Sequence, residues 1–308
     1  MEHTPIQADP AAELALFEAM RERDAAYRAG FDWDASWAHL TKRLSEGALH
    51  DMGFTGFDGP PMVERMIRWI DHFDYPCPVD VARLQALEDE ARLRDGRALR
   101  VLGLDPAAVN LSAVARYSAQ DFWFQREAVP LARNERLKTV LDFGAGHGRQ
   151  GTLWHETGAT MIAVDATPGP YLAQRAYARA LGWEVADYLD GVEGWGPGSY
   201  AHLPSWRMDL IPEGSVDMVI AVQVLREVTK PMLVLALAHF QRVLRPGGRL
   251  YVRDHVGFHN VNAVDQDAAL RAHGFEVEWR PHWVDREDVH GVPRLWRKVD
   301  PAVVLGGV

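Results

Sequence analysis

The hydrophobic positions of the chain follow one pattern before about residue 135 and another after it. In the first part, apolar residues recur every three or four positions, which predicts amphipathic helices over 11–28, 33–44, 62–72 and 81–94. In the second part, short continuous apolar runs alternate with helical stretches, which is typical of α/β proteins. The pattern predicts a helical amino-terminal region over 1–135 and an α/β domain over 136–308.

Six apolar runs predict the strands of the α/β domain. The first four run on without polar alternation, as parallel strands covered on both faces do. The last two alternate with period two, which predicts a terminal antiparallel pair. Before the fourth run, a helix expected over 230–244 ends at Pro246 and Gly247. In chain order the runs are 140–143, 161–165, 215–222, 250–252, 275–279 and 293–299.

Residues 140–151, which read VLDFGAGHGRQG, are the most informative segment. A strand leads into Gly144, Gly146 and Gly148, and a residue without Cβ lets the backbone take positive φ and approach a ligand closely. The spacing is G-x-G-x-G, and Arg149 stands where the dinucleotide fingerprint G-x-G-x-x-G has its third glycine. The segment predicts a cofactor turn that departs from the NAD pattern.

This turn and the segments after it resemble class I S-adenosylmethionine-dependent methyltransferases. Asp142 with the three glycines is similar to the first family motif, and Asp165 ends the next apolar run about 20 residues on. The L-R-P-G-G segment at 244–248 is a second hallmark. The resemblance covers about 137–299 and implies a doubly wound, Rossmann-like sheet of seven strands with a terminal antiparallel hairpin.

S-adenosyl-L-methionine is the cofactor that the resemblance implies. Asp165, at the carboxyl end of the second strand, is expected to accept hydrogen bonds from both ribose hydroxyls. In the family, an acidic residue shortly before the strand that corresponds to 215–222 contacts the adenine amino group, and Asp209 occupies that place. Tyr117 is expected near the methionine end of the cofactor. The full set of expected cofactor residues is Asp142, Gly144, Ala145, Gly146, Gly148, Asp165, Ala166, Asp209, Leu210, Gln223 and Tyr117.

Methyl transfer from a sulfonium is an in-line displacement that depends mainly on alignment and the exclusion of water. A hydroxyl acceptor also loses a proton, and a positioned base contributes about two to four powers of ten in rate. His255 comes just after the strand expected at 250–252 and is the first choice of base. Asp254 is expected to orient it, and His259 is a second candidate. Arg226, Trp123, Trp195 and Tyr200 are expected to bind the acceptor; the last two lie in a Gly/Pro-rich stretch that predicts their exposure.

Charge and composition exclude several other classes of function. The formal net charge of −10 and a pI near 5.7 leave no general positive field for nucleic acid. Apolar runs are too short for a membrane span, and the amino terminus has no signal-peptide pattern. The single cysteine, Cys77, excludes an internal disulfide and a thiolate metal cluster, so we expect a metal-independent cytoplasmic protein. Oligomeric state is not readable.

The favoured interpretation is a methyltransferase that acts on a small molecule, at a hydroxyl of a sugar or natural product. Methylation at nitrogen or carbon is the first alternative. An NAD-dependent oxidoreductase shares the strand-turn-helix start but needs a glycine in place of Arg149. A non-catalytic module that keeps the fold for binding is the third.

Overall fold

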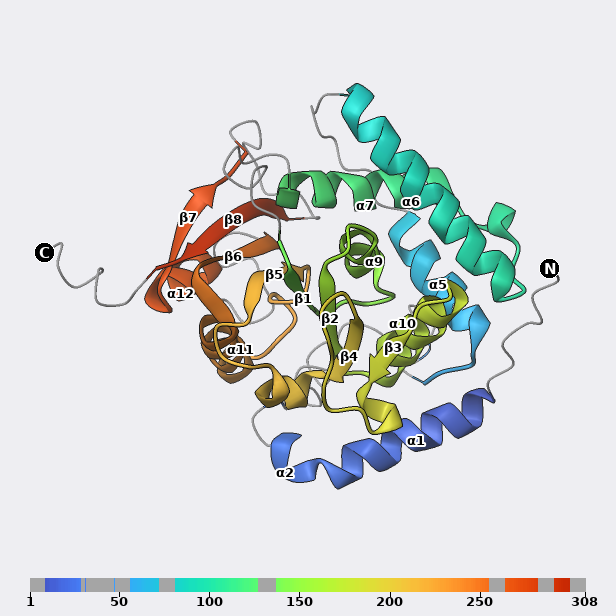
Figure 1. The fold of residues 1–308 in the computed structure, drawn as a ribbon, viewed down its shortest axis with the longest axis horizontal. Coiled ribbons are helices and arrows are strands. Elements are labelled where there is room, and N and C mark those ends of the chain that lie inside the picture. The colour runs from blue at the N-terminus through green and yellow to red at the C-terminus, as the bar shows by residue number, and fades with distance from the viewer. Residues whose placement is uncertain are drawn as a thin grey trace, which may run out of the picture.

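A computed structural model describes residues 9–28, 31, 47, 56–71, 81–126, 137–254, 264–281 and 291–299. In this part of the chain, a single mixed sheet crosses the molecule and helices lie on both of its sides (Figure 1). The predicted doubly wound α/β fold with a helical amino-terminal region is therefore confirmed.

In the described part of the chain the sheet has eight strands, one more than the resemblance implied. They are β1 (Thr139–Phe143), β2 (Thr160–Asp165), β3 (Val185–Asp187), β4 (Tyr200–Pro204), β5 (Val216–Val222), β6 (Leu244–Asp254), β7 (Phe275–Trp279) and β8 (Val292–Lys298). The order across the sheet is β3-β4-β2-β1-β5-β6-β8-β7. All neighbours are parallel except the pairs that β8 makes with β6 and β7, so the terminal antiparallel pair is confirmed. The edge strand β3 has three residues, too few to show periodicity.

The helices divide into those that precede the sheet and those that connect its strands. The first group is α1 (Pro10–Arg23), α2 (Ala25–Arg28), α5 (Pro60–Asp71), α6 (Val81–Val101) and α7 (Leu111–Arg126). The second group is α9 (Arg149–Glu156), α10 (Pro168–Ala180), α11 (Lys230–Val243) and α12 (Gln266–Ala272). Short 3-10 turns are η1 (Pro106–Ala108), η2 (Tyr188–Asp190) and η3 (Ser205–Leu210).

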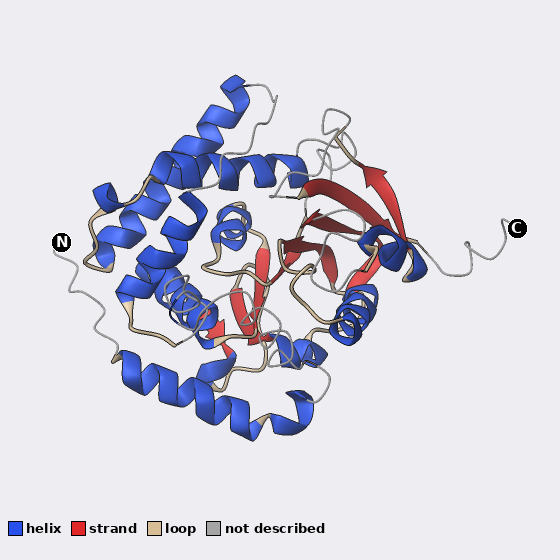
Figure 2. Cartoon of the chain, turned by 180° about the vertical axis from the view of Figure 1, so that it is seen from behind, coloured by secondary structure: helices blue, strands red, loops and turns tan. Residues whose placement is uncertain are grey.

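The central strands are apolar at successive positions because each face of the sheet is covered by helices. Val140 of β1 packs in a buried cluster with Leu153 of α9. Leu141 and Phe143 belong to the other cluster, where the Phe143 ring lies 5.1 Å from that of Phe240 in α11. Figures 1 and 2 show α9 and α11 on opposite sides of the sheet. This alternation accounts for the continuous apolar runs in the sequence.

The amino-terminal helices pack on one another and on the α/β part. Helix α6 lies against α7, α5 against α7 and α10, and α7 against α9 (Figure 2). Met62, Val63 and Ile67 of α5 are fully buried in the same cluster as Leu141 of β1. The helix expected over 33–44 lies outside the described residues. The described helices thus share a core with the sheet.

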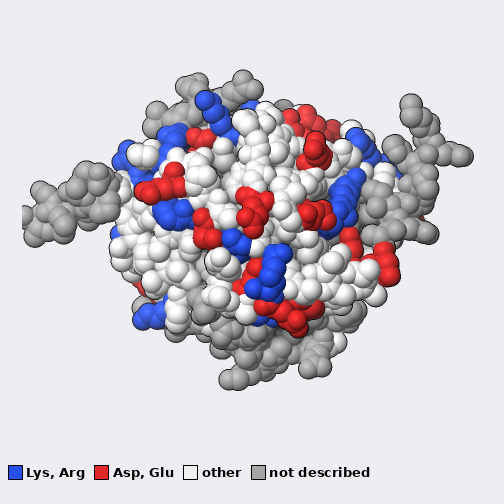
Figure 3. Space-filling model, turned by 60° about the horizontal axis from the view of Figure 1, so that its bottom comes forward, with Lys and Arg blue, Asp and Glu red and all other residues white. Residues whose placement is uncertain are grey.

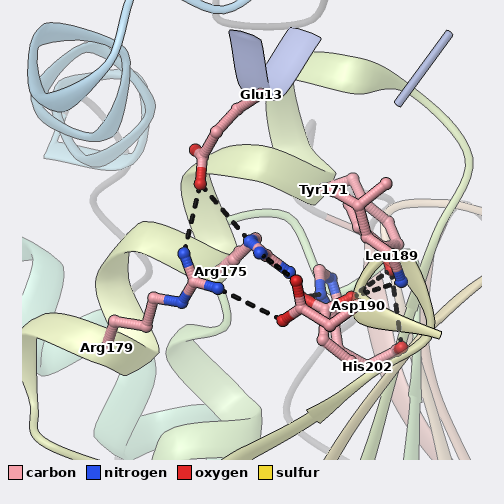
Figure 4. A network of polar contacts seen from close by, with 8 residues as sticks. Glu13, Tyr171, Arg175, Arg179, Leu189, Asp190 and His202 are labelled. Atoms are coloured by element: carbon pink, nitrogen blue, oxygen red, sulfur yellow. Dashed lines mark hydrogen bonds and ion pairs between the residues drawn. The ribbon is translucent and has the colours of Figure 1, made fainter. Parts of the chain in front are cut away.

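Helix α1 is held by a buried ionic network at the edge of the sheet (Figure 4). Glu13 of α1 accepts hydrogen bonds from Arg175 at 3.4 Å and Arg179 at 3.1 Å, both on α10. Arg175 also donates to Asp187 at 2.5 Å and to Asp190 at 2.6 Å. The network ties α1 to α10 and to the carboxyl end of β3.

In the described part of the chain, no helix combines the length and apolar character needed to cross a membrane.

Candidate functional site

The glycine turn connects β1 to α9 at the carboxyl edge of the sheet. Gly144, Gly146 and Gly148 have φ values of 71°, 61° and 86°, in the left-handed region where a Cβ is strained. Gly148 is the N-cap of α9. The sequence therefore folds here as predicted, with a strand, a tight turn and a helix whose first amides face the turn.

The three glycines have different neighbours. A Cβ on Gly144 would lie 2.5 Å from Cγ2 of Val224, and one on Gly148 would lie 3.0 Å from the hydroxyl of Tyr200. A Cβ on Gly146 would meet only Cε of Met66, at 3.9 Å. Two of the glycines therefore make room for protein side chains, and Gly146 is the one whose backbone has open space beside it.

Asp165 joins the glycine turn to the end of β2. Its Oδ2 accepts the Gly146 N–H at 3.0 Å, and its Oδ1 accepts the Ala166 N–H at 2.8 Å. The carboxyl group is buried, and burial raises its pKa to about 6 against the pull of these amides. The turn and the acid, far apart in sequence, are in direct contact. A buried acceptor beside an open glycine is the arrangement that a ribose needs.

Asp142, at the end of β1, lies beneath the same turn. It is buried, and burial raises its pKa to about 7, while Arg149 and the Gly151 amide favour the ionised form. Its Oδ2 has no hydrogen-bond partner among the described residues. Such an orphaned buried acceptor fits a site designed for a polar or cationic ligand.

Helix α7 docks beside this turn through a buried acid that sequence reasoning did not select. Asp121 accepts hydrogen bonds from Arg149 at 2.9 Å, from Arg253 at 2.7 and 2.9 Å, and from the Tyr251 hydroxyl at 2.6 Å. The ring centre of Tyr117 lies 4.5 Å from the guanidinium carbon of Arg149 and 4.2 Å from that of Arg253. Tyr117 is thereby brought next to the glycine turn. The one signal in the sequence is an acidic residue, Asp121, directly before three consecutive aromatic residues of α7.

The segment after β5 lies over the turn. Gln223 has φ 56°, the only positive value at a non-glycine residue in the described part of the chain. Its N–H donates to the Arg253 carbonyl at 2.9 Å, and the Arg226 N–H donates to Oδ2 of Asp254 at 2.9 Å. The predicted residues Gln223, Arg226 and Asp254 are therefore gathered at one edge of the sheet.

Asp209 and Leu210 are the last two residues of η3, which follows β4. The Asp209 carboxylate is 44% exposed and pairs with Arg207, whose Nε lies 3.0 Å from Oδ1. Leu210 packs half-buried against the core. Because Asp165 is in register with Pro204, the last residue of β4, η3 begins at the same carboxyl edge of the sheet as Asp165.

The predicted exposure of Trp195 and Tyr200 is wrong. Tyr200 is the first residue of β4 and is 1% exposed, and Trp195 packs half-buried against the core. Ser199 accepts the N–H of Met161 at the start of β2, so this end of the loop lies at the opposite edge of the sheet from Asp165. The Gly and Pro residues before Tyr200 predict a loop, but β4 begins directly after them.

The remaining predicted residues are placed only in part. Trp123 is half-buried on α7, with its ring 5.4 Å from that of Phe124. The predicted bases His255 and His259 lie outside the described residues. Within the described ranges, no three His, Cys, Asp or Glu side chains are grouped so as to hold a metal ion.

Comparisons with known proteins address the family. Residues 141–252 match the model of the methyltransferase domain family. No curated protein matches the chain. Solved structures with similar folds include the cyclase SpnF, which is 17% identical over 61% of this chain and 82% of that one, with a TM-score of 0.43.

Two further solved structures are methyltransferases. The 1,6-didemethyltoxoflavin N1-methyltransferase of Burkholderia thailandensis, with S-adenosylhomocysteine bound, is 18% identical over 74% of this chain and 94% of that one, with a TM-score of 0.40. A SAM-dependent methyltransferase from Methanosarcina mazei is 14% identical over 56% of this chain and 98% of that one, with a TM-score of 0.38. Because these values are low, no site or substrate is transferred from them. Residues 141–252 therefore form a methyltransferase domain similar to those of class I S-adenosylmethionine-dependent methyltransferases, which makes the chain an enzyme with S-adenosylmethionine as its cofactor.

Proposed function

We propose that this enzyme methylates a hydroxyl group of a small molecule. The observation that carries the proposal is the position of α5, whose Met66 side chain lies against the glycine turn at Gly146. A site covered by a helix of the amino-terminal region excludes water and admits only small acceptors. On this reasoning, residues 1–135 act as a cap and residues 136–308 form the cofactor domain.

The described residues suggest how the cofactor would be held. Asp165 would accept the two ribose hydroxyls, and the open backbone at Gly146 would let the adenosyl group lie close to the turn. Asp209, with Leu210, would contact the adenine, and Tyr117 would lie near the methionine end. Bound S-adenosylmethionine supplies a methyl group on a positively charged sulfur. The carboxylates of Asp142 and Asp165 favour such a cation at this edge of the sheet.

The chain's charge distribution supports a small acceptor over a nucleic acid. The net charge is −10, and the face in Figure 3 carries acidic and basic side chains interspersed, without an area of one sign. Phosphate backbones are gathered by clustered Lys and Arg. We also propose a cytoplasmic location, because a single cysteine suits a reducing compartment.

The test of acceptor type is a comparison of matched compounds. Alcohols and the amines of the same carbon skeleton are offered with methyl-labelled cofactor, and the product's methyl carbon is located by NMR. A labelled methyl group on oxygen supports the proposal. If every compound that is methylated carries the label on nitrogen or carbon, the enzyme is an N- or C-methyltransferase instead. NAD, as a negative control, should leave the melting temperature unchanged, whereas S-adenosylhomocysteine should raise it.

The cap is tested by Met66→Ala. We expect S-adenosylhomocysteine to dissociate faster from this variant, by roughly tenfold, since the substitution opens the space over Gly146 and removes apolar contact. Leu16→Ala is the control, because Leu16 on α1 is 53% exposed. Equal dissociation rates in both variants and the wild type would contradict a capping role for α5.

A further inference from the structure

The turn between β5 and α11 occupies the centre of the sheet's carboxyl edge. The order β2-β1-β5-β6 places β1 and β5 side by side, with successive strands running outward from them in opposite directions. Ligands of doubly wound sheets bind outside the carboxyl ends of the strands at this reversal point. Residues 223–229 therefore lie where the methyl group and its acceptor must meet.

Three contacts hold this turn in place. The Gln223 N–H donates to the Arg253 carbonyl, the Arg226 N–H donates to Asp254 Oδ2, and Val224 fills the space that Gly144 leaves free. Gln223 takes φ 56°, a left-handed conformation that is strained for a residue with a Cβ. Strain retained between firm contacts on β6 and the glycine turn is typical of functional segments. These contacts hold Arg226 and Glu227, two residues of the turn itself, in a fixed position.

The carboxylate of Glu227 is partly exposed and weakly paired. Its side chain is 24% exposed, and among the described residues it pairs with Arg226, whose Nε lies 3.9 Å from Oε1. Two other carboxylates, Asp254 at the end of β6 and Asp165 at the end of β2, are near enough to repel its negative charge. Burial raises the pKa of Glu227 to about 7, Arg226 opposes the rise, and Asp254 and Asp165 add to it.

We propose that Glu227 is the catalytic proton acceptor of the methyl transfer. The proposal rests on the hydroxyl acceptor proposed above. As the acceptor oxygen forms its bond to the methyl carbon, the carbon–sulfur bond breaks and its electron pair stays on sulfur. The oxygen–hydrogen bond breaks in turn, and the proton goes to the Glu227 carboxylate. The products are the methyl ether, S-adenosylhomocysteine and protonated Glu227.

The chemistry of the surroundings suits this role. A carboxylate that is repelled by Asp165 and Asp254 gains from taking up a proton, because protonation relieves repulsion from both. Arg226 is near enough to keep Glu227 ionised at rest but too far to bind it firmly. A base whose affinity for protons is matched to neutral conditions is the most effective one.

The deciding experiment compares Glu227→Gln with Glu213→Gln and His255→Ala over pH 5.5 to 9. Glu213 is exposed just before the amino end of β5, so its variant carries the same change at the opposite end of the same strand. The wild-type kcat should rise through about pH 7 as Glu227 ionises. Glu227→Gln should lower kcat by about 100- to 10,000-fold and lose that rise, while Glu213→Gln keeps it.

Binding of S-adenosylhomocysteine distinguishes a base from a cofactor ligand. Glu227→Gln should leave its Kd within about threefold of the wild type, and Glu227→Asp, which keeps the carboxylate, should restore part of kcat and the pH dependence. The proposal is overturned if Glu227→Gln keeps the pH dependence, if the Kd rises as much as kcat falls, or if only His255→Ala removes the rise. If the wild type methylates amines alone while Glu227→Gln still loses the rise, the hydroxyl acceptor fails and Glu227 stands.

Discussion

The burial of the Asp165 carboxyl group predicts an unusual pH dependence of stability. Asp165→Asn removes a carboxyl group whose pKa is about 6 in the folded protein and 3.8 in an unfolded chain. Because the folded state binds this proton more tightly, the contribution of Asp165 is fully present below about pH 4 and is lost as the pH rises through about 6. At about 1.4 kcal/mol per pKa unit, the loss is roughly 3 kcal/mol.

The assay is urea unfolding of the wild type and Asp165→Asn at a series of pH values from about 4 to 8. The difference between the two free energies of unfolding cancels the other titrating groups and should shift by roughly 3 kcal/mol in favour of the variant. Parallel curves over this range would refute the claim that the buried carboxylate is costly to ionise. Each protein must unfold in a single transition for the comparison to hold.

The same variant should bind the cofactor product poorly. Hydrogen bonds to a charged group contribute about 1.5–3 kcal/mol, so loss of the carboxylate should weaken S-adenosylhomocysteine binding on the order of 100-fold. Asp217→Asn is the control: Asp217 also accepts two backbone N–H groups, from Lys138 and Thr139, but at the amino edge of the sheet. Unchanged affinity in Asp165→Asn would exclude Asp165 as the ribose acceptor.

Two further predictions concern the turn and its support. Gly146→Ala should lose affinity for S-adenosylhomocysteine in calorimetry. The control is Gly214→Ala, at a similar φ of 64° with no neighbour within 4 Å, which should lose only about 1 kcal/mol of stability. Equal affinities of the two variants would remove Gly146 from the site. Asp121→Asn leaves two buried guanidinium groups without their shared carboxylate and should cost about 3–5 kcal/mol in chemical denaturation. Asp89→Asn, at a half-exposed pair, should change stability by at most about 0.5 kcal/mol, and a similar loss in both would contradict this reasoning.

The sequence was sufficient to predict the features that are local in the chain. A strand, three glycines and a helix start are encoded within a dozen consecutive positions, so the turn could be predicted along with Asp165 at the end of the next strand. The terminal antiparallel pair was equally readable, because alternation with period two directly reflects strand geometry. Each of these depends on backbone conformation rather than on distant packing.

Features that depend on distant packing were not predictable. Nothing in α5 shows that Met66 meets Gly146 rather than another core position, since both outcomes need the same apolar stripe. Asp121 and Arg253 are 132 positions apart, and only the docking of α7 brings them together. The Gly and Pro residues before Tyr200 predict a loop, and the strand that begins at Tyr200 has only five residues, too few to change that prediction.

The network around Glu13 has a consequence for the order in which the protein is made. Its partners Arg175 and Arg179 stand 162 and 166 positions later, so the ribosome completes α1 long before it supplies their charges. Contacts of such sequence separation form late, because a long stretch of chain must first be ordered. We therefore expect α1 to be synthesised well before α10 and to be among the last helices to dock during folding.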